Sequence, residues 1–170
     1  MRRAARPTLC SVALQCDATL SYSARVPRSL GAKRSSMYEE VSMNNFQYTV
    51  ASSKSFDAAV SAIEQKAAEK GFRVLHTHDF ASTLAEKGFV REPLKLVEIC
   101  NARYANEVLN KDVSVALMLP CPIAVYTKDG KTFISTMRPS VLADFYPNSE
   151  IEDIAAAVEK TVLEIVNEAR

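Results

Sequence analysis

The sequence predicts an α+β fold: a single mostly antiparallel sheet with helices packed on one face and a long C-terminal helix. Three observations support this. An alternating strand pattern at residues 46–50 is followed at once by an amphipathic helix pattern. An Asp-Gly pair at 129–130 separates two apolar runs, which is a strong hairpin signal. The last helix, about twenty residues long, needs a whole sheet face to cover it.

The first strand and helix follow from local spacing. Phe46, Tyr48 and Val50 alternate in "FQYTV", so we expect a strand with these side chains on one face. Ser55 is the expected N-cap of a helix over 55–70 that ends at Gly71. The apolar stripe of that helix is Phe56, Ala59, Val60, Ile63 and Ala67.

The middle of the chain predicts further strands. "FRVLHTHDF" (72–80) is the second, and regular alternation would place Phe72, Val74, His76, His78 and Phe80 on one face. A short helical turn ends at Gly88. "LKLVEIC" (94–100) is the third strand, Asn101 is the expected N-cap of a short helix, and "VSVALML" (113–119) is the fourth strand.

A two-residue turn at Asp129-Gly130 defines the pairing of the hairpin. It pairs Lys128 with Lys131, Tyr126 with Phe133 and Val125 with Ile134, and the same register would place Cys121 opposite Arg138.

The final helix, predicted over 150–169, has the clearest pattern. Ser149 and Glu152 match a capping box at its start. Its apolar stripe is Ile151, Ile154, Ala155, Val158, Val162, Ile165, Val166 and Ala169.

Residues 1–42 differ from the domain predicted over 45–170. They are rich in Arg, Ser and Ala and show neither a helix nor a strand period, so we expect a disordered or non-native extension. A start at Met37 or Met43 would make them an over-extended gene prediction. The alternatives are an organellar transit peptide and, less well matched, a secretory signal.

Charge and composition exclude several classes of function. Residues 1–42 carry seven Lys/Arg and three Asp/Glu, which leaves 14 and 17 in the rest, a net charge of −3. This balance does not suit nucleic-acid binding. No apolar run is long enough to cross a membrane. No glycine-rich phosphate loop or hydrolase motif occurs, so whether the protein is an enzyme stays open.

The two histidines form the first candidate site. His76 and His78 lie two residues apart on a predicted strand, about 7 Å from each other on one face. They could share a metal ion if a neighbouring strand supplied a third ligand. The alternative is two histidines on a solvated or half-buried face.

Two cysteines form the second candidate site. Cys100 and Cys121 each lie at the end of a predicted strand. The positive start of a helix beside Cys100, and Arg138 opposite Cys121, would lower their thiol pKa values. The pair could then bind a soft metal or cycle as a redox couple. Alternatively, both are small buried apolar side chains.

Arg138, together with Thr136 and Asn101, forms the third candidate site. An arginine among hydrogen-bond donors could hold a carboxylate or phosphate. It could equally make a structural ion pair with Glu98 or Asp144, which we favour.

Several motifs occur in an order that resembles a known family. "LKLVEICNARYANEVL", "LMLPCPIAVY" and "STMRP", within residues 45–168, resemble the domain-of-unknown-function 302 family of bacteria and archaea, which has a Thermus-type structure. The resemblance implies a small α+β domain, often a homodimer, without an established activity. Its recurrent motif positions correspond to Cys100, Asn101, Tyr104, Ala105, Pro120, Cys121 and Pro139.

The function expected from these observations is a small ligand-binding or interaction domain. We expect a homodimer in the cytoplasm, or in an organelle if residues 1–42 are a transit peptide, with no nucleic-acid or membrane partner. The expected pocket lies near Cys100, Asn101 and Cys121, with Tyr104 and Arg138 as further ligand-binding residues. The alternative is a thiol- or metal-dependent protein that uses Cys100 and Cys121, with His76 or His78.

Overall fold

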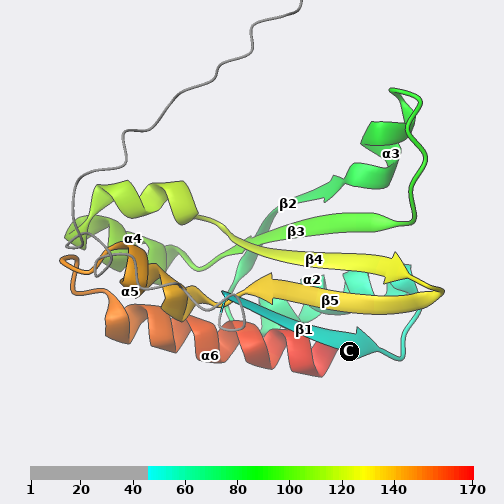
Figure 1. The fold of residues 1–170 in the computed structure, drawn as a ribbon. Coiled ribbons are helices and arrows are strands. Elements are labelled where there is room, and N and C mark those ends of the chain that lie inside the picture. Colours follow the sequence, from blue (N-terminus) through cyan, green and yellow to red (C-terminus); the bar gives the residue numbers. More distant parts are fainter. Residues whose placement is uncertain (1–45) are drawn as a thin grey trace, which may run out of the picture. The chain divides into compact units, whose positions relative to one another are not determined.

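The computed structural model describes residues 46–170 (Figure 1). One five-stranded antiparallel sheet has the order β1-β5-β4-β3-β2, which confirms the α+β prediction. The expectations for residues 1–42 lie outside the described residues, and the domain boundary at residue 45 stays a prediction. The elements are β1 (Gln47–Ser52), α2 (Phe56–Glu69), β2 (Arg73–Asp79), α3 (Phe80–Ala85), β3 (Leu94–Cys100), α4 (Ala102–Lys111), η1 (Val113–Met118), β4 (Cys121–Lys128), β5 (Lys131–Met137), η2 (Pro139–Val141), α5 (Leu142–Phe145) and α6 (Glu152–Ala169).

The main apolar core lies between the sheet and two helices, α2 and α6. Both helices bury the stripes predicted from their 3.6-residue periods. Alternate side chains of the central strands point toward the helices and are completely buried. The fully buried members from the strands are Val97, Ile99, Ile123, Val125 and Ile134, and those from the helices include Ile63, Val162, Ile165 and Val166.

The β4–β5 hairpin has the predicted turn. Asp129 and Gly130 both have positive φ, 52° and 72°, as the expected two-residue turn requires. The predicted register holds as far as the pair Ile123 and Thr136.

Beyond that pair the predicted register is wrong, because β4 and β5 separate. Pro122 has no N–H, and its carbonyl accepts a hydrogen bond from the Thr136 hydroxyl at 2.8 Å. The Arg138 N–H donates to the carbonyl of Phe46. The pairing of β4 with β5 ends at Ile123 and Thr136, so Cys121 does not pair with Arg138; on the β3 side of β4, Cys121 lies opposite Ile99.

A β-bulge in β2 changes which side chains share a face. The pairing with β3 shifts between Val74 and His76, so Leu75 is the extra residue. Thr77 now points toward the helices and donates to Glu64 of α2 at 2.9 Å. Phe72 and Val74 pack in the core, whereas His76 and His78 lie on the opposite face. The prediction of one shared face for 72–80 is therefore wrong.

The prediction of a strand over 113–119 is also wrong, since Val113–Met118 form the 3-10 helix η1. Asp112 precedes it and accepts hydrogen bonds from the backbone N–H and the hydroxyl of Ser114, at 2.9 and 2.6 Å. Such a side-chain cap competes with strand pairing. Val115 is fully buried, while Leu117 is 84% exposed.

The capping box predicted at the start of α6 does not form. The Ser149 hydroxyl donates to the Asp112 carboxylate at 2.7 Å instead, and α6 has no side-chain cap. A serine suits an N-cap, but here its hydroxyl bonds to a residue that is distant in sequence. The contact ties the start of α6 to the beginning of η1.

Half-buried apolar side chains lie on the sheet face opposite α2 and α6. Tyr126 and Phe133 stack there, with ring centroids 5.5 Å apart. Within residues 46–170, no helix is long and apolar enough to span a membrane. We call the sheet face opposite α2 and α6 the open face; it comprises Leu94, Leu96, Ala124, Tyr126 and Phe133.

Candidate functional site

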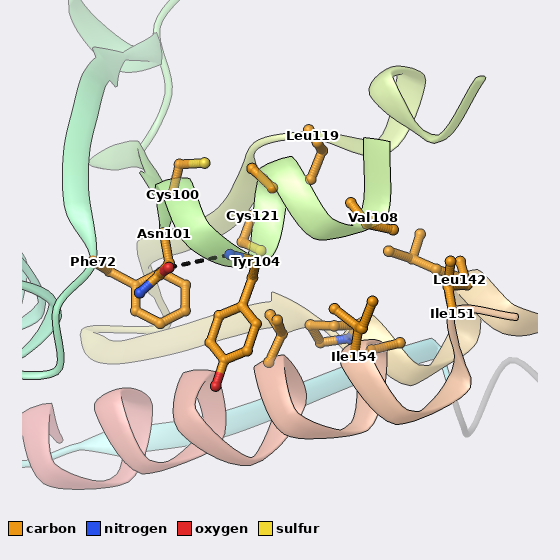
Figure 2. Close-up of a pocket in the computed structure, with 14 residues that line it drawn as sticks. Phe72, Cys100, Asn101, Tyr104, Val108, Leu119, Cys121, Leu142, Ile151 and Ile154 are labelled. Atoms are coloured by element: carbon orange, nitrogen blue, oxygen red, sulfur yellow. Dashed lines mark hydrogen bonds between the residues drawn. The ribbon is translucent and has the colours of Figure 1, made fainter. Parts of the chain in front are cut away.

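An apolar pocket lies between α4 and α6, beside the ends of β3 and β4 (Figure 2). It contains about 460 Å³ of space not filled by atoms, part of it open to solvent. Within it, about 40 Å³ is available to the centres of water-sized molecules, which is room for a few waters. The lining residues are Phe72, Cys100, Asn101, Tyr104, Ala105, Val108, Leu119, Cys121, Pro139, Leu142, Ile151, Ile154, Ala155 and Val158.

Asn101 positions the helical wall of the pocket. Its side-chain oxygen accepts hydrogen bonds from the N–H groups of Arg103 and Tyr104, at 3.1 and 3.3 Å, so it caps α4 as predicted. Its amide nitrogen donates to the carbonyl of Gly71 at 3.0 Å. Gly71 has a φ of +75° and ends α2. The cap therefore ties α4 to the start of β2, and Tyr104 extends from α4 toward α6 (Figure 2).

The rest of the pocket lies where two apolar clusters meet. Phe72 and Val158 belong to the main core between the sheet and the helices. Leu142 and Ile151 belong to a smaller cluster around α4, η1 and α5. Ile154 packs against both clusters. The pocket is the space that these two clusters leave between them.

Both cysteines line this pocket, but their thiols are not activated. Burial, together with the neighbouring Cys100, raises the pKa of the Cys121 thiol to about 11. Burial also raises the pKa of Cys100. The predicted lowering is therefore wrong for both thiols. Arg138 does not face Cys121, and at the start of α4 the desolvation of Cys100 outweighs any attraction of the helix for its thiolate.

Arg138 lies outside the pocket lining and forms an ion pair with Glu159 of α6, at 2.8 Å. Glu159 also accepts hydrogen bonds from the backbone N–H and the hydroxyl of Ser140. The Arg138 guanidinium lies over the ring of Tyr48, 5.2 Å from its centroid. Its partner is thus neither of the two carboxylates expected from the sequence, and Glu159 was not anticipated.

The histidines lie apart from the pocket. The rings of His76 and His78 have centroids 4.4 Å apart, and His78 Nε2 lies 3.2 Å from Glu98 Oε1. Neither histidine lines the pocket. Residues 46–170 include no group of three or more His, Cys, Asp or Glu side chains arranged to hold a metal ion.

Sequence reasoning found the cap and the two thiols of the pocket but missed most of its apolar wall. Part of this wall is the apolar stripe of α6, which the sequence predicted as core, and part is α4, for which no apolar face was predicted. The positions named for the family motifs all line the pocket except Pro120, whose peptide bond with Leu119 is cis. The missed lining residues are Phe72, Ala105, Val108, Leu119, Pro139, Leu142, Ile151, Ile154, Ala155 and Val158.

Comparisons with known proteins agree with the motifs. The family model described as "Domain of unknown function DUF302" matches residues 48–169. The solved structure of an uncharacterized conserved DUF302 protein from Bacillus stearothermophilus is 31% identical and has a TM-score of 0.70. The match covers 74% of this chain and 98% of that one. No curated protein matches significantly. The chain therefore belongs to the domain-of-unknown-function family DUF302.

Proposed function

We propose that this protein binds a small, largely apolar molecule in the pocket between α4 and α6. The observation that carries the proposal is a pocket lined by apolar side chains, partly open to solvent, with about 40 Å³ available to the centres of water-sized molecules. Protein interiors normally contain few voids larger than one water molecule. A ligand that removes these side chains from water would bind through the hydrophobic effect.

The polar groups of the pocket support an uncharged chemical group in its interior. The Asn101 amide already makes three hydrogen bonds to the backbone. The raised pKa values of Cys100 and Cys121 keep both thiols protonated at neutral pH. The Tyr104 hydroxyl has no hydrogen-bond partner among residues 46–170, so it is the remaining donor for a ligand. Binding would therefore rest on burial and contact rather than on charge.

The experiment is a titration of the full chain with N-phenyl-1-naphthylamine, a neutral apolar dye that fluoresces when it leaves water. We expect saturable binding to the native protein. Ala105→Leu, which places a larger side chain in the pocket, should abolish it. Ala102→Leu is the matched control, because Ala102 is exposed on the same helix. The absence of saturable binding, or equal binding by both variants, would refute the proposal.

A thiol- or metal-dependent function is the second candidate, because Cys100 and Cys121 line the same pocket. The raised thiol pKa values weigh against a resting thiolate, although a soft metal could displace the protons. Native mass spectrometry of the wild type and of Cys100→Ser/Cys121→Ser would separate the two proposals. A stoichiometric metal that is lost in the double variant would favour the second. Unchanged dye binding by a metal-free double variant would favour the first.

We also propose that a second copy of the chain covers the open face. The support is a half-buried apolar surface that includes the stacked pair Tyr126 and Phe133. Sedimentation should show a homodimer for the wild type and a monomer for Phe133→Lys. Ser61→Lys, at an exposed position of α2, should leave the dimer intact. A monomeric wild type would contradict the proposal.

A cytoplasmic location is the remaining proposal. Its support is that both cysteines of the described residues are free thiols, as expected in a reducing compartment. Cell fractionation with an antibody against the folded part would test it, and accumulation in an organelle or outside the cell would contradict it.

A further inference from the structure

We infer that the ligand is amphipathic: an apolar body enters the pocket, and an anionic head group stays at the rim near Arg73 and Arg103. This inference rests on the proposed function, because it assigns the chemical class of the molecule that the pocket takes. Two exposed arginines next to the lining residues Cys100 and Tyr104, together with a lining that contains no charged side chain, carry it.

Arg73 supplies the first positive charge. It is the first residue of β2 and is paired in register with Cys100, which lines the pocket. Its side chain is exposed, and it makes no ion pair with any of residues 46–170. A guanidinium in this position can offer two parallel hydrogen bonds to a carboxylate, sulfonate or phosphate.

Arg103 supplies the second positive charge at the rim. Its guanidinium lies over the ring of Tyr104, 5.8 Å from the centroid, and Tyr104 lines the pocket. Its side chain is 80% exposed and bonds to Glu107 at 2.9 Å, one turn further along α4. Glu107 reduces the net charge at this point. An exposed pair of this kind contributes little stability, so an anionic ligand can compete for the arginine.

The interior of the pocket excludes the head group. A carboxylate placed among Val108, Leu142 and Ile151 would lose its water without gaining an ionic partner, which is strongly unfavourable. The one capping amide in the lining is already used by the backbone. An anionic ligand therefore binds with its charge outside, at the side where Cys100 and Tyr104 are only half-buried.

Two dyes that share one apolar body test the inference. N-phenyl-1-naphthylamine is neutral, and 8-anilinonaphthalene-1-sulfonate adds one anionic group to the same rings. We expect Arg73→Gln/Arg103→Gln to weaken the anionic dye about fivefold or more, and to leave the neutral dye within about twofold. Raising the salt concentration should likewise weaken only the anionic dye. Arg91→Gln, on the loop before β3, is the control and should change neither dye.

The outcomes distinguish this inference from the proposed function. If the neutral dye binds and Ala105→Leu abolishes its binding, the pocket proposal stands. If the arginine variant then affects neither dye, or weakens both equally, the amphipathic assignment is wrong. Binding of the anionic dye that survives Ala105→Leu lies outside the pocket and also overturns the assignment. If neither dye binds the native protein, the proposed function itself fails.

Discussion

The main core and the pocket are built from the same kinds of side chain but differ in how they are filled. In the core, residues such as Val97, Ile123 and Ile134 alternate along regular strands and meet the regular stripes of α2 and α6. Around the pocket, the side chains come from the short elements α4, η2 and α5, from the ends of β3 and β4, and from α6. Figure 1 shows α4 and α5 at one end of the sheet, beside the start of α6.

The difference shows how regular periods lead to dense packing. Two elements with long constant periods interdigitate along their whole length. Short elements are placed by individual contacts, such as the Asn101 cap and the bond from Ser149 to Asp112. These contacts satisfy backbone and side-chain groups without requiring the apolar side chains between them to fill every space.

The largest effect that tests this comparison is on stability. Ile123 and Ile151 are both fully buried, one in the core and one at the pocket. We expect Ile123→Ala to lower the free energy of unfolding by about 4 kcal/mol, because it opens a new cavity. Ile151→Ala only enlarges an existing space, so it should cost about 2 kcal/mol. Urea unfolding measures both values, and equal losses would show that the two regions are packed alike.

The reactivity of Cys121 should show how enclosed the inner wall of the pocket is. Its pKa of about 11 leaves roughly a hundredfold less thiolate at pH 8 than an ordinary cysteine has. Iodoacetamide should therefore modify Cys121 about a hundredfold more slowly than a free cysteine, with the rate rising until the pH passes about 11. The measurement is mass spectrometry of tryptic peptides from the wild type, in which Cys100 and Cys121 lie on different peptides and are read separately. Rapid modification at pH 8 would contradict an enclosed thiol.

Glu159 connects α6 to the residues after β5, and its removal should have an intermediate effect. Burial alone would raise its pKa, but hydrogen bonds from Ser140 and Arg138 outweigh this and hold the pKa below its usual 4.5. We expect Glu159→Gln to cost about 1–2 kcal/mol at pH 7.

The pH dependence checks that this cost comes from the carboxylate. Because the folded-state pKa is lowered, the stabilisation is present above about pH 4.5 and is lost as the pH falls through the folded-state value. The difference in unfolding free energy between wild type and variant should therefore shrink in acid. Glu152→Gln, at an exposed position of α6, should show neither the cost nor the pH dependence. A difference that is constant with pH would argue for lost packing instead.

The smallest effect on stability is expected from Ala105→Leu. The larger side chain enters space that is already empty, so the free energy of unfolding should change by less than about 1 kcal/mol. Thermal unfolding measures this change. A large loss of stability would mean that the pocket wall is as tightly packed as the core, and the dye experiment would then need a smaller substitution at this position.

Local patterns predicted the regular part of the fold because each of its signals depends on neighbours in sequence. The stripes of α2 and α6, the Asn101 cap and the Asp129-Gly130 turn all formed as expected. Predictions were wrong where a contact distant in sequence replaced the local pattern. Ser149 bonds to Asp112 instead of capping α6, and the bulge at Leu75 separates the histidines from Phe72.

By itself, the sequence determined the elements of the regular core and the presence of two thiols and a capping amide near one another. Only the tertiary structure decided that α4 and α6 leave a space between them, that burial raises the thiol pKa values, and that Glu159 is the partner of Arg138. The physical reason is the distance along the sequence over which each effect acts. Periods and caps act over a few residues, whereas desolvation and unfilled volume depend on side chains that approach from every part of the chain.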